Sequence, residues 1–402
     1  MEVDLLERRR QADGTESLLT LNMGPQHPST HGVLRVILEL DGETVVRATP
    51  DIGYLHTGIE KTIENKTYTQ AITLTDRMDY LAPMSNNLAF CLATEKLLDL
   101  EIPARAQVVR VILTELTRLN SHLVWVGTHA LDIGAMSMLL YAFREREMIL
   151  GIYELVSGQR MMSSYFRVGG LAEDIPRDFE GRVREILQVF PSRIADYEGL
   201  LEENPIWQER TRGVGRVDAS TALNLGLTGP SLRASGVRYD CRLASPYSGY
   251  DRYQFDVPTE TGCDVFSRYR VRMREMRESL RIIEQAVGDI PPGDFMARKR
   301  GVTPPPKSAV VTEMEALIHH FKWVSEGFAV PAGEAYVPIE SPKGEMGFYL
   351  VSDGGVQPYR AKCRPPCFVN LSALSALVQG RLVADVVAVI GSLDIVLGEI
   401  DR

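Results

Sequence analysis

Two histidines lie four residues apart in the segment GPQHPSTHG, near the start of the chain. On a helix, the spacing of His27 and His31 would let two imidazoles bind one metal ion. However, Pro28 stands between them, and the glycines and prolines around it are typical of a loop. In a loop, a spacing of four residues does not place two side chains on one face. The two histidines therefore do not predict a helical metal site, and their role needs another explanation.

A second polar segment, RMDYLAPMSNN, spans residues 77–87. Polar side chains interrupt a stretch that we otherwise expect to be buried: Arg77, Asp79, Tyr80, Asn86 and Asn87. Inside a protein, each of these side chains needs a hydrogen-bond partner. The segment therefore predicts either a structural network of hydrogen bonds or the lining of a site, and the residue types alone do not separate the two.

The third candidate is Asp132, in the segment THALDIGAM. It follows a long apolar stretch with helical periodicity and stands two residues before Gly134, so we expect it at the C-terminal end of a helix. The helix dipole repels a carboxylate at that end. We therefore expect a cation or a histidine to pair with Asp132 and to stabilise its carboxylate.

Five cysteines are present, an odd number that is typical of reduced thiols in a cytoplasmic protein of this length. Cys363 and Cys367 have the spacing C-x-x-x-C, which indicates a metal or redox pair less strongly than C-x-x-C. The other three are single and far apart in the sequence. We therefore expect no cysteine metal site, and the sequence assigns no role to these two thiols.

The composition limits the classes of partner. The chain has 402 residues and a formal net charge of −9. Because phosphate contacts need a basic surface, this charge argues against nucleic acid. The charged opening, MEVDLLERRRQADGTE, resembles neither a signal peptide nor a transit peptide. No apolar run reaches the roughly 18 residues of a membrane span, so we expect the chain to serve any membrane process from outside the bilayer.

The elements that must position the candidate residues follow an α+β order. Residues 1–58 have strand patterns, with a hairpin expected at the turn Asp41-Gly42. Residues 59–330 predict a central bundle of long helices, the clearest of which follows Pro103. Residues 331–402 predict a small β-sheet and two closing helices.

Two parts of the helical region are less regular. Within residues 176–203 we expect two shorter helices, because Pro191 stands where a single helix would have its interior. Residues 204–260 are rich in glycine, proline and tyrosine and predict an irregular segment. We expect the long helices, rather than these parts, to form the centre of the fold.

Five motifs occur together in one known family, in this order and at similar spacing: GPQHPSTHGVLR, RMDYLAPMSNN, LRASG, SPKGEMG and GSLDIVLGEIDR. From about Leu18 to Arg402, the chain resembles the hydrogenase-like, quinone-site subunit of the proton-pumping NADH:quinone oxidoreductases, respiratory complex I. The resemblance implies a helical bundle related to the large subunit of nickel–iron hydrogenases. It also implies a role in passing electrons from an iron–sulfur cluster to quinone.

The hydrogenase relatives bind nickel and iron through the motifs R-x-C-G-x-C and D-P-C-x-x-C. Here Arg77 is followed by Asp79 and Ala82 at the two positions of the first cysteine pair, and only Cys367 matches the second motif. Thiolates are the ligands that such metals require. The resemblance thus implies a cavity that has lost its metals and accepts a quinone headgroup.

The resemblance also assigns roles within that cavity. It implies that His31 and Tyr80 hydrogen-bond the two carbonyl oxygens of the quinone and that Asp132 pairs with His31. Lining positions would be His27, Thr128 and Val396, with His27 mainly shaping its loop. A quinone takes up two electrons and two protons, so a histidine that titrates near neutral pH and a tyrosine hydroxyl are suitable donors.

The electrons must come from other subunits, because the chain has no flavin or dinucleotide motif and no cysteine set for an iron–sulfur cluster. The resemblance implies that FMN and the cluster belong to other peripheral-arm subunits, that Arg77 faces the cluster, and that membrane-arm subunits are partners. It places the chain on the cytoplasmic face of the cell membrane. A passive scaffold and a hydrogenase large subunit are the alternatives, and a donor other than NADH is compatible with this sequence.

Two positions differ from many relatives. Met162 stands where they have a histidine that makes the cluster potential depend on pH, and Thr57 stands where they have an arginine. Methionine cannot take up a proton. We therefore expect a neighbouring cluster whose potential is nearly independent of pH around neutrality.

Overall fold

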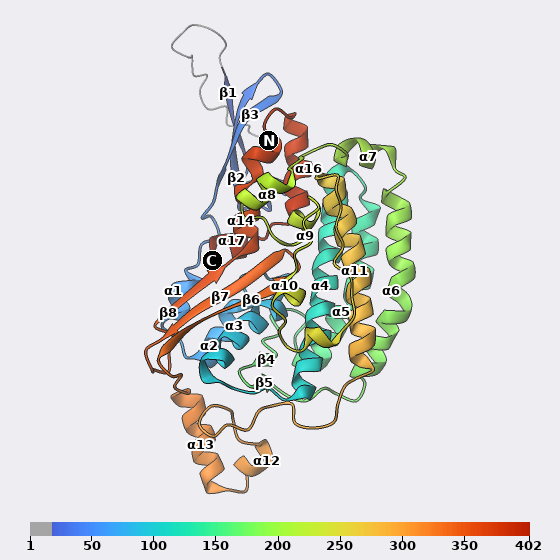
Figure 1. Cartoon of the computed structure of the whole chain (residues 1–402). Helices are drawn as coiled ribbons and strands as arrows, with labels where there is room; N and C mark the ends of the chain where they lie inside the picture. Colours follow the sequence, from blue (N-terminus) through green and yellow to red (C-terminus); the bar gives the residue numbers. More distant parts are fainter. Residues whose placement is uncertain (1–17) are drawn as a thin grey trace.

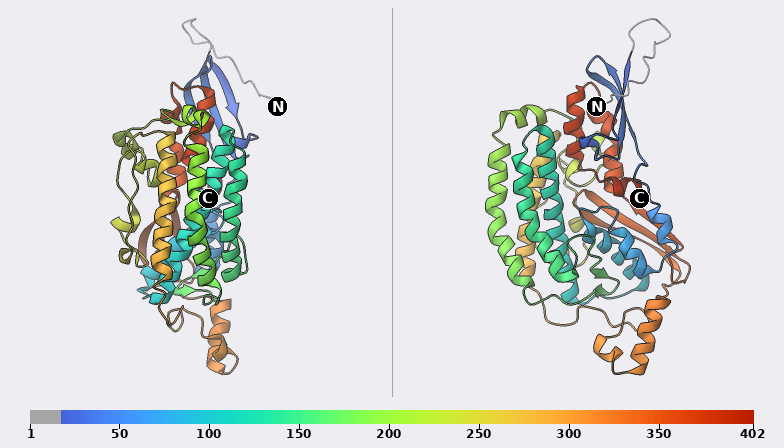
Figure 2. Two further views of the ribbon diagram at one scale, coloured as in Figure 1. Left: turned by 90° about the vertical axis from the view of Figure 1, so that its right-hand side faces the viewer. Right: turned by 180° about the vertical axis from the view of Figure 1, so that it is seen from behind.

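The computed structural model describes residues 18–402. Four long helices run side by side on one flank, and smaller sheets and short helices occupy the other (Figures 1 and 2). The fold is α+β, as the sequence predicts. No helix within residues 18–402 is long and apolar enough to cross a membrane.

The N-terminal sheet has three antiparallel strands in the order β1-β2-β3: Leu19–Met23, Arg35–Asp41 and Thr44–Asp51. In β2, the buried residues alternate with half-buried ones, as in a strand with one face on the core. Gly42 makes the predicted turn between β2 and β3 with φ of +60°. The sequence pattern does not separate β1 from this hairpin.

The helical bundle is built from the long helices α4, α5, α6 and α11: Ala104–Ile133, Ser137–Ser157, Phe179–Leu201 and Val265–Val287. Helix α4 packs against both α5 and α11, so most of its surface is buried. This burial explains why the apolar stripe after Pro103 is so pronounced. The shorter helices α1, α2 and α3 precede the bundle: Ile59–Ile63, Tyr68–Thr75 and Pro83–Leu98.

The prediction of two helices around Pro191 is wrong. Helix α6 is continuous from Phe179 to Leu201 and contains Pro191 in its interior. A proline there removes one backbone hydrogen bond, but α6 packs along α5 and α11, and this packing holds the helix together.

The irregular segment contains short helices α7 to α10 and a 3-10 turn at Tyr250–Arg252: Pro205–Thr211, Ala219–Asn224, Gly229–Arg233 and Cys241–Ala244. Before it, β4 and β5 form a two-stranded hairpin, Phe166–Arg167 and Gly170–Leu171. After α11, the chain reaches α12 and α13, Lys307–Val310 and Met314–Ser325, which project from one end of the molecule (Figure 1).

Helix α13 exposes an apolar stripe to solvent. Met314, Leu317, Ile318, Phe321 and Val324 are between 51% and 75% exposed. Only Ala316 of this helix is buried. In the isolated chain, therefore, this amphipathic helix has no apolar partner on that face among residues 18–402.

The C-terminal sheet is antiparallel in the order β6-β7-β8: Gly333–Ser341, Gly344–Ser352 and Arg360–Arg364. It packs on α3. Four short helices follow instead of the two expected, α14 to α17: Pro366–Ser372, Leu374–Val378, Val383–Leu393 and Leu397–Asp401. The predicted sheet is thus confirmed, and the predicted number of closing helices is wrong.

The two ends of the described chain share one hydrophobic cluster. Strands β1 to β3 pack with the closing helices, and the N–H of Gly380 donates to the carbonyl of Val45 at 2.8 Å. The division at residues 58 and 330 stays a prediction, but this cluster joins residues from its first and last parts. The arrangement carries the loop after β1 towards the end of the bundle, where α16 packs on α4.

Candidate functional site

A cavity of about 190 Å³ lies between the loop after β1, the segment after α2, the end of α4 and the segment around α16. Five of the predicted site residues line it: His31, Tyr80, Thr128, Asp132 and Val396. These residues are far apart in the sequence, and the fold brings them to one place. His27 and Arg77 are not among its lining residues.

The loop that carries His31 is held by its own backbone. A short 3-10 helix, Pro28–Thr30, ends at His31, whose φ of 55° is left-handed and whose N–H donates to the carbonyl of Pro28. At the other end, Nδ1 of His27 accepts a hydrogen bond from the N–H of Ser29 at 3.2 Å. His27 therefore caps this helix and shapes the loop, while His31 reaches the cavity.

Buried amides fix the segment that carries Tyr80. The side-chain nitrogen of Asn86 donates to the carbonyls of Thr75 and Asp79, at 3.0 and 3.1 Å. Asn87 donates to Thr75 Oγ1 at 2.9 Å. Both interpretations of the polar segment therefore apply, because its asparagines form a structural network and its tyrosine lines the cavity.

Helix α4 presents Thr128 and Asp132 in its last two turns and ends at Gly134, which has a left-handed φ of 109°. The helix end is where the sequence predicts it. Both side chains are exposed on the cavity side, and the Thr128 hydroxyl donates back to the carbonyl of Val124 at 2.9 Å. Val396, by contrast, is 1% exposed and forms an apolar part of the wall.

The expected pairing of Asp132 with His31 is not a direct contact between the two side chains. Within residues 18–402, no hydrogen bond or ion pair joins the two side chains. Burial raises the pKa of Asp132, and a hydrogen bond from Ser29 and the nearby His27 oppose this rise. Asp132 thus faces the other end of the loop. The pairing of Asp132 with His31 stays a prediction.

His31 and Tyr80 are both held in their neutral forms. Burial and then the positive charge of Lys343 lower the pKa of His31, which disfavours its imidazolium form. Burial and then the charge of Asp79 raise the pKa of Tyr80, so its hydroxyl keeps its proton at neutral pH. A neutral imidazole and a protonated phenol can each donate one hydrogen bond into the cavity.

The cavity has two further polar residues that the sequence does not single out, His129 and Asp394. His129 is buried, stacks on Trp125 at 5.4 Å between ring centroids, and has no hydrogen-bond partner for either ring nitrogen among the described residues. Burial lowers its pKa to about 3. Its position one turn before Asp132 on the same helix is the signal that could have identified it.

Asp394 lies in the segment between α16 and α17. Burial raises its pKa to about 6, and Lys343 and Arg272 offset this only in part. The Lys343 ammonium and the Arg272 guanidinium each lie 3.9 Å from its Oδ2. The motif GSLDIVLGEIDR contains this aspartate, but residue types and spacing give no reason to prefer it to the other acids of the motif.

Arg77 lies outside the cavity. Its side chain is 54% exposed and its nearest acid is Asp76, at 3.8 Å. Met162 is half-buried in the segment after α5, and Thr57 is exposed. An exposed, weakly paired arginine is available to a neighbouring protein, and the role that the resemblance implies for Arg77 stays a prediction.

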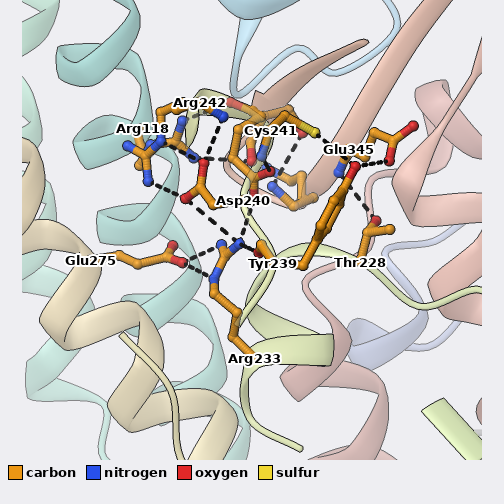
Figure 3. A network of polar contacts seen from close by, with 12 residues as sticks. Arg118, Thr228, Arg233, Tyr239, Asp240, Cys241, Arg242, Glu275 and Glu345 are labelled. Atoms are coloured by element: carbon orange, nitrogen blue, oxygen red, sulfur yellow. Dashed lines mark hydrogen bonds and ion pairs between the residues drawn. The ribbon is translucent and has the colours of Figure 1, made fainter. Parts of the chain in front are cut away.

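A dense set of buried ion pairs lies between α4, α11, the segment of α9 and α10, and strand β6 (Figure 3). We call it the ionic core, and its members are Glu115, Arg118, Arg233, Asp240, Arg242, Glu275 and Glu340. Arg233 is at its centre, since its guanidinium donates to Glu340 Oε1 at 2.7 Å and to Glu275 Oε1 at 2.9 Å. Arg272, three residues before Glu275 on α11, connects this core to Asp394 in the cavity wall.

The acids, histidines and cysteines of the described residues are spread over the fold. Within residues 18–402, no group of three or more histidine, cysteine, aspartate or glutamate side chains is arranged to bind a metal ion. Cys363 and Cys367 are buried, and burial raises the pKa of both thiols well above the ordinary value. Such thiols are poor ligands.

The comparisons with known proteins all indicate one family. Residues 132–402 match the family described as respiratory-chain NADH dehydrogenase, 49 Kd subunit. An NADH-quinone oxidoreductase subunit of Chloroflexus aurantiacus is 60% identical over 97% of this chain and 95% of its own length. The counterpart from Geotalea uraniireducens is 60% identical over 96% of this chain and 99% of its own length. A third, from Solibacter usitatus, is 59% identical over 99% and 97%.

Proposed function

Because the chain belongs to the family of the 49 kDa subunit of respiratory-chain NADH dehydrogenase, we propose that its cavity is the place where this oxidoreductase complex reduces quinone. In this proposal, the quinone headgroup lies between His31 and Tyr80, one side chain at each carbonyl oxygen. Electrons arrive from an iron–sulfur cluster that a neighbouring subunit holds, and FMN belongs to a further subunit.

One observation carries the proposal: His31 and Tyr80, 49 positions apart in the sequence, line the same cavity. Within the described residues, no protein group hydrogen-bonds the His31 ring or the Tyr80 hydroxyl, so both remain available to a ligand. The volume of about 190 Å³ is below the roughly 300 Å³ at which pockets for drug-sized ligands begin. It suits a single ring better than a ring with its isoprenoid tail.

The two donors have different tasks. Quinol formation needs a proton at each oxygen, and general acids of this kind contribute about 100-fold or more to a rate. Tyr80 keeps its proton until negative charge develops on the headgroup. His31 is exposed on its outer side and can exchange protons with solvent. Thr128 and Val396 limit the space around the ring, and Asp132 would pair with His31 once the loop closes on a ligand.

The surroundings of the site support the other parts of the proposal. The exposed guanidinium of Arg77 would favour the reduced, more negative state of a neighbouring cluster. Met162 cannot titrate, so the potential of that cluster would be nearly independent of pH. We also propose that the cavity descends from the metal site of a nickel–iron hydrogenase and that the chain works at the cytoplasmic face of the membrane, between the cluster subunit and the membrane arm.

Substitution of Tyr80 by phenylalanine in the assembled complex tests the proposal. Tyr80→Phe removes one hydroxyl and keeps the ring, so quinone reductase turnover is expected to fall by about 100-fold or more. The matched control is Tyr359→Phe, because Tyr359 is 70% exposed, and it is expected to leave turnover unchanged. Full turnover of an assembled Tyr80→Phe complex contradicts the proposal. Loss of assembly in both His31 and Tyr80 variants favours the passive scaffold instead.

A further inference from the structure

Three buried carboxyl groups and one buried ammonium group lie close to Tyr80. The ammonium group of Lys343 is 3.1 Å from Asp79 Oδ2, 3.9 Å from Asp394 Oδ2 and 2.5 Å from the hydroxyl of Ser121. Glu399, in the first turn of α17, is the third acid. None of the three acids or the lysine is more than 6% exposed. We call these four groups the acid–lysine cluster.

A glycine brings α17 against the segment that carries Tyr80. A Cβ atom on Gly398 would lie 2.8 Å from the carbonyl oxygen of Arg77, 2.7 Å from that of Met78 and 3.6 Å from Tyr80 Cδ1. Only a residue without a side chain allows this approach. The next residue, Glu399, is therefore held directly beside the Tyr80 segment by backbone packing.

Glu399 differs from the other two acids because no cation pairs with it. Neither of its carboxyl oxygens has a full hydrogen bond within residues 18–402, and none of the ion pairs there includes it. The thiol and the N–H of Cys367 lie close to this carboxyl group. An ionised carboxylate in such a place would lose its hydration without compensation.

The charged and titratable groups around Glu399 also favour its protonated form. It is faced by Asp79, by Lys343, and by the thiols of Cys363 and Cys367. Both thiols are neutral, because burial raises their pKa values. Burial and then the negative charge of Asp79 raise the pKa of Glu399, and Lys343 offsets this only in part. Lys343 and the Arg272 guanidinium beside Asp394 supply two positive charges against the three acids Asp79, Asp394 and Glu399. Charge balance therefore requires a proton on one of the acids.

We propose that Glu399 stores a carboxylic-acid proton for the quinone site and delivers it, through the Asp79–Lys343 pair, to Tyr80. This inference rests on the proposed function. When the two electrons from the neighbouring cluster reach the headgroup, the O–H bond of Tyr80 breaks and an O–H bond forms on the headgroup. The Lys343 ammonium then returns a proton to the phenolate, and Glu399 protonates the resulting amine. Net transfer leaves Glu399 as a carboxylate opposite the Lys343 ammonium, until solvent reloads it.

Substitution of Glu399 by glutamine in the assembled complex tests the proton store, because Glu399→Gln keeps the shape and removes only the proton. The direct readout is the infrared difference spectrum between oxidised and reduced complex. The wild type is expected to lose a carboxylic-acid C=O band on reduction, and this band shifts in D₂O. The variant is expected to lack that band and to have a quinone reductase kcat lower by about tenfold or more, with an unchanged KM for quinone.

The matched control is Glu326→Gln, at an exposed acid just after α13. It is expected to keep both the band and the turnover. An identical band in the wild type and Glu399→Gln overturns the inference, and so does full turnover of the variant. If the variant does not assemble, infrared difference spectra of the wild type at rising pH test the inference instead. The carboxylic-acid C=O band is expected to disappear as Glu399 ionises. A wild-type complex that never shows this band overturns the inference.

The two proposals can fail separately. Full turnover of Tyr80→Phe would refute the quinone site, yet the carboxylic-acid band of Glu399 could still be measured in that complex. Conversely, loss of turnover in Tyr80→Phe together with full turnover in Glu399→Gln would keep the quinone site and refute the proton store.

Discussion

The ionic core and the cavity wall contain acids that are equally buried but ionise very differently. In the ionic core, burial alone would raise the pKa of Glu115, but Arg118 and Arg242 outweigh it and lower the pKa to about 2. In the cavity wall, burial dominates and raises the pKa of Asp394 to about 6. Both acids have two cations, so the distance decides the sign: the arginines lie 3.1 and 3.2 Å from Glu115, whereas Lys343 and Arg272 lie 3.9 Å from Asp394.

This difference separates structural from chemical charges. Arginines outweigh burial at Glu115, Asp240 and Glu275 and lower their pKa values, so these acids stay ionised at physiological pH and hold the chain in one arrangement. Glu340 is the exception in the ionic core, because its burial outweighs Arg233 and raises its pKa. An acid whose cations are more distant, such as Asp394, exchanges its proton near neutral pH, and Asp394 lines the cavity. The bundle thus provides a fixed charged interior directly beside a site that titrates.

The largest effect is expected when the centre of the ionic core is broken. Arg233→Met leaves Glu275 and Glu340 without their shared cation, so the free energy of unfolding should fall by about 3–5 kcal/mol. Urea denaturation of the purified subunit measures this loss. Arg300→Met is the control, because the Arg300 side chain is 89% exposed and should change stability by less than about 0.5 kcal/mol. Equal stability of the two variants would show that the ionic core is not structural.

A pH series compares the two regions directly. Because the folded-state pKa of Asp394 is raised from 3.8 to about 6, its contribution to stability is complete below pH 4 and is lost as the pH rises through 6. Asp394→Asn does not titrate, so it should gain stability relative to the wild type between pH 4 and 7, by up to about 3 kcal/mol.

Glu115→Gln should have the opposite slope in the same series. The lowered pKa of Glu115 gives stability that is present above its unfolded pKa and is lost as the pH falls towards 2. The deficit of this variant is therefore largest at neutral pH and shrinks in acid. Parallel curves for the two variants would mean that pairing does not distinguish the two regions.

The smallest effect is expected at the contact between α17 and the Tyr80 segment. Gly398→Ala forces a methyl group against two backbone carbonyls, which should cost about 1–3 kcal/mol and displace Tyr80. Thermal unfolding measures the first effect and quinone reductase turnover the second. Gly199→Ala in α6 is the control, because nothing lies within 4 Å of the added methyl group, and it should be neutral or slightly stabilising. A control as damaging as the variant would refute the close approach.

Much of the fold could be predicted from the sequence because local patterns determine it. The hairpin at Gly42, the helix that ends at Gly134 and the C-terminal sheet all follow from turn residues and hydrophobic period. The continuous helix through Pro191 could not be predicted, because the packing that stabilises it comes from α5 and α11, which are distant in the sequence.

The residues of the candidate site can be predicted mainly from the resemblance to the family. Residue types indicate His31, Tyr80 and Asp132 as candidates, but only the family motifs assign them to one site. In the folded chain, all three line the same cavity. The sequence does not single out His129 and Glu399, because their importance depends on the partners that they lack in the folded chain. A missing partner leaves no pattern in a sequence.

The unpartnered stripe on α13 has a consequence for the life of the subunit in the cell. A newly made copy that has not joined its complex presents Phe321 and its neighbours to water, and such a patch favours self-association. Synthesis of this chain must therefore be matched in amount to the proteins that assemble with it, and surplus copies are natural targets for chaperones and proteases.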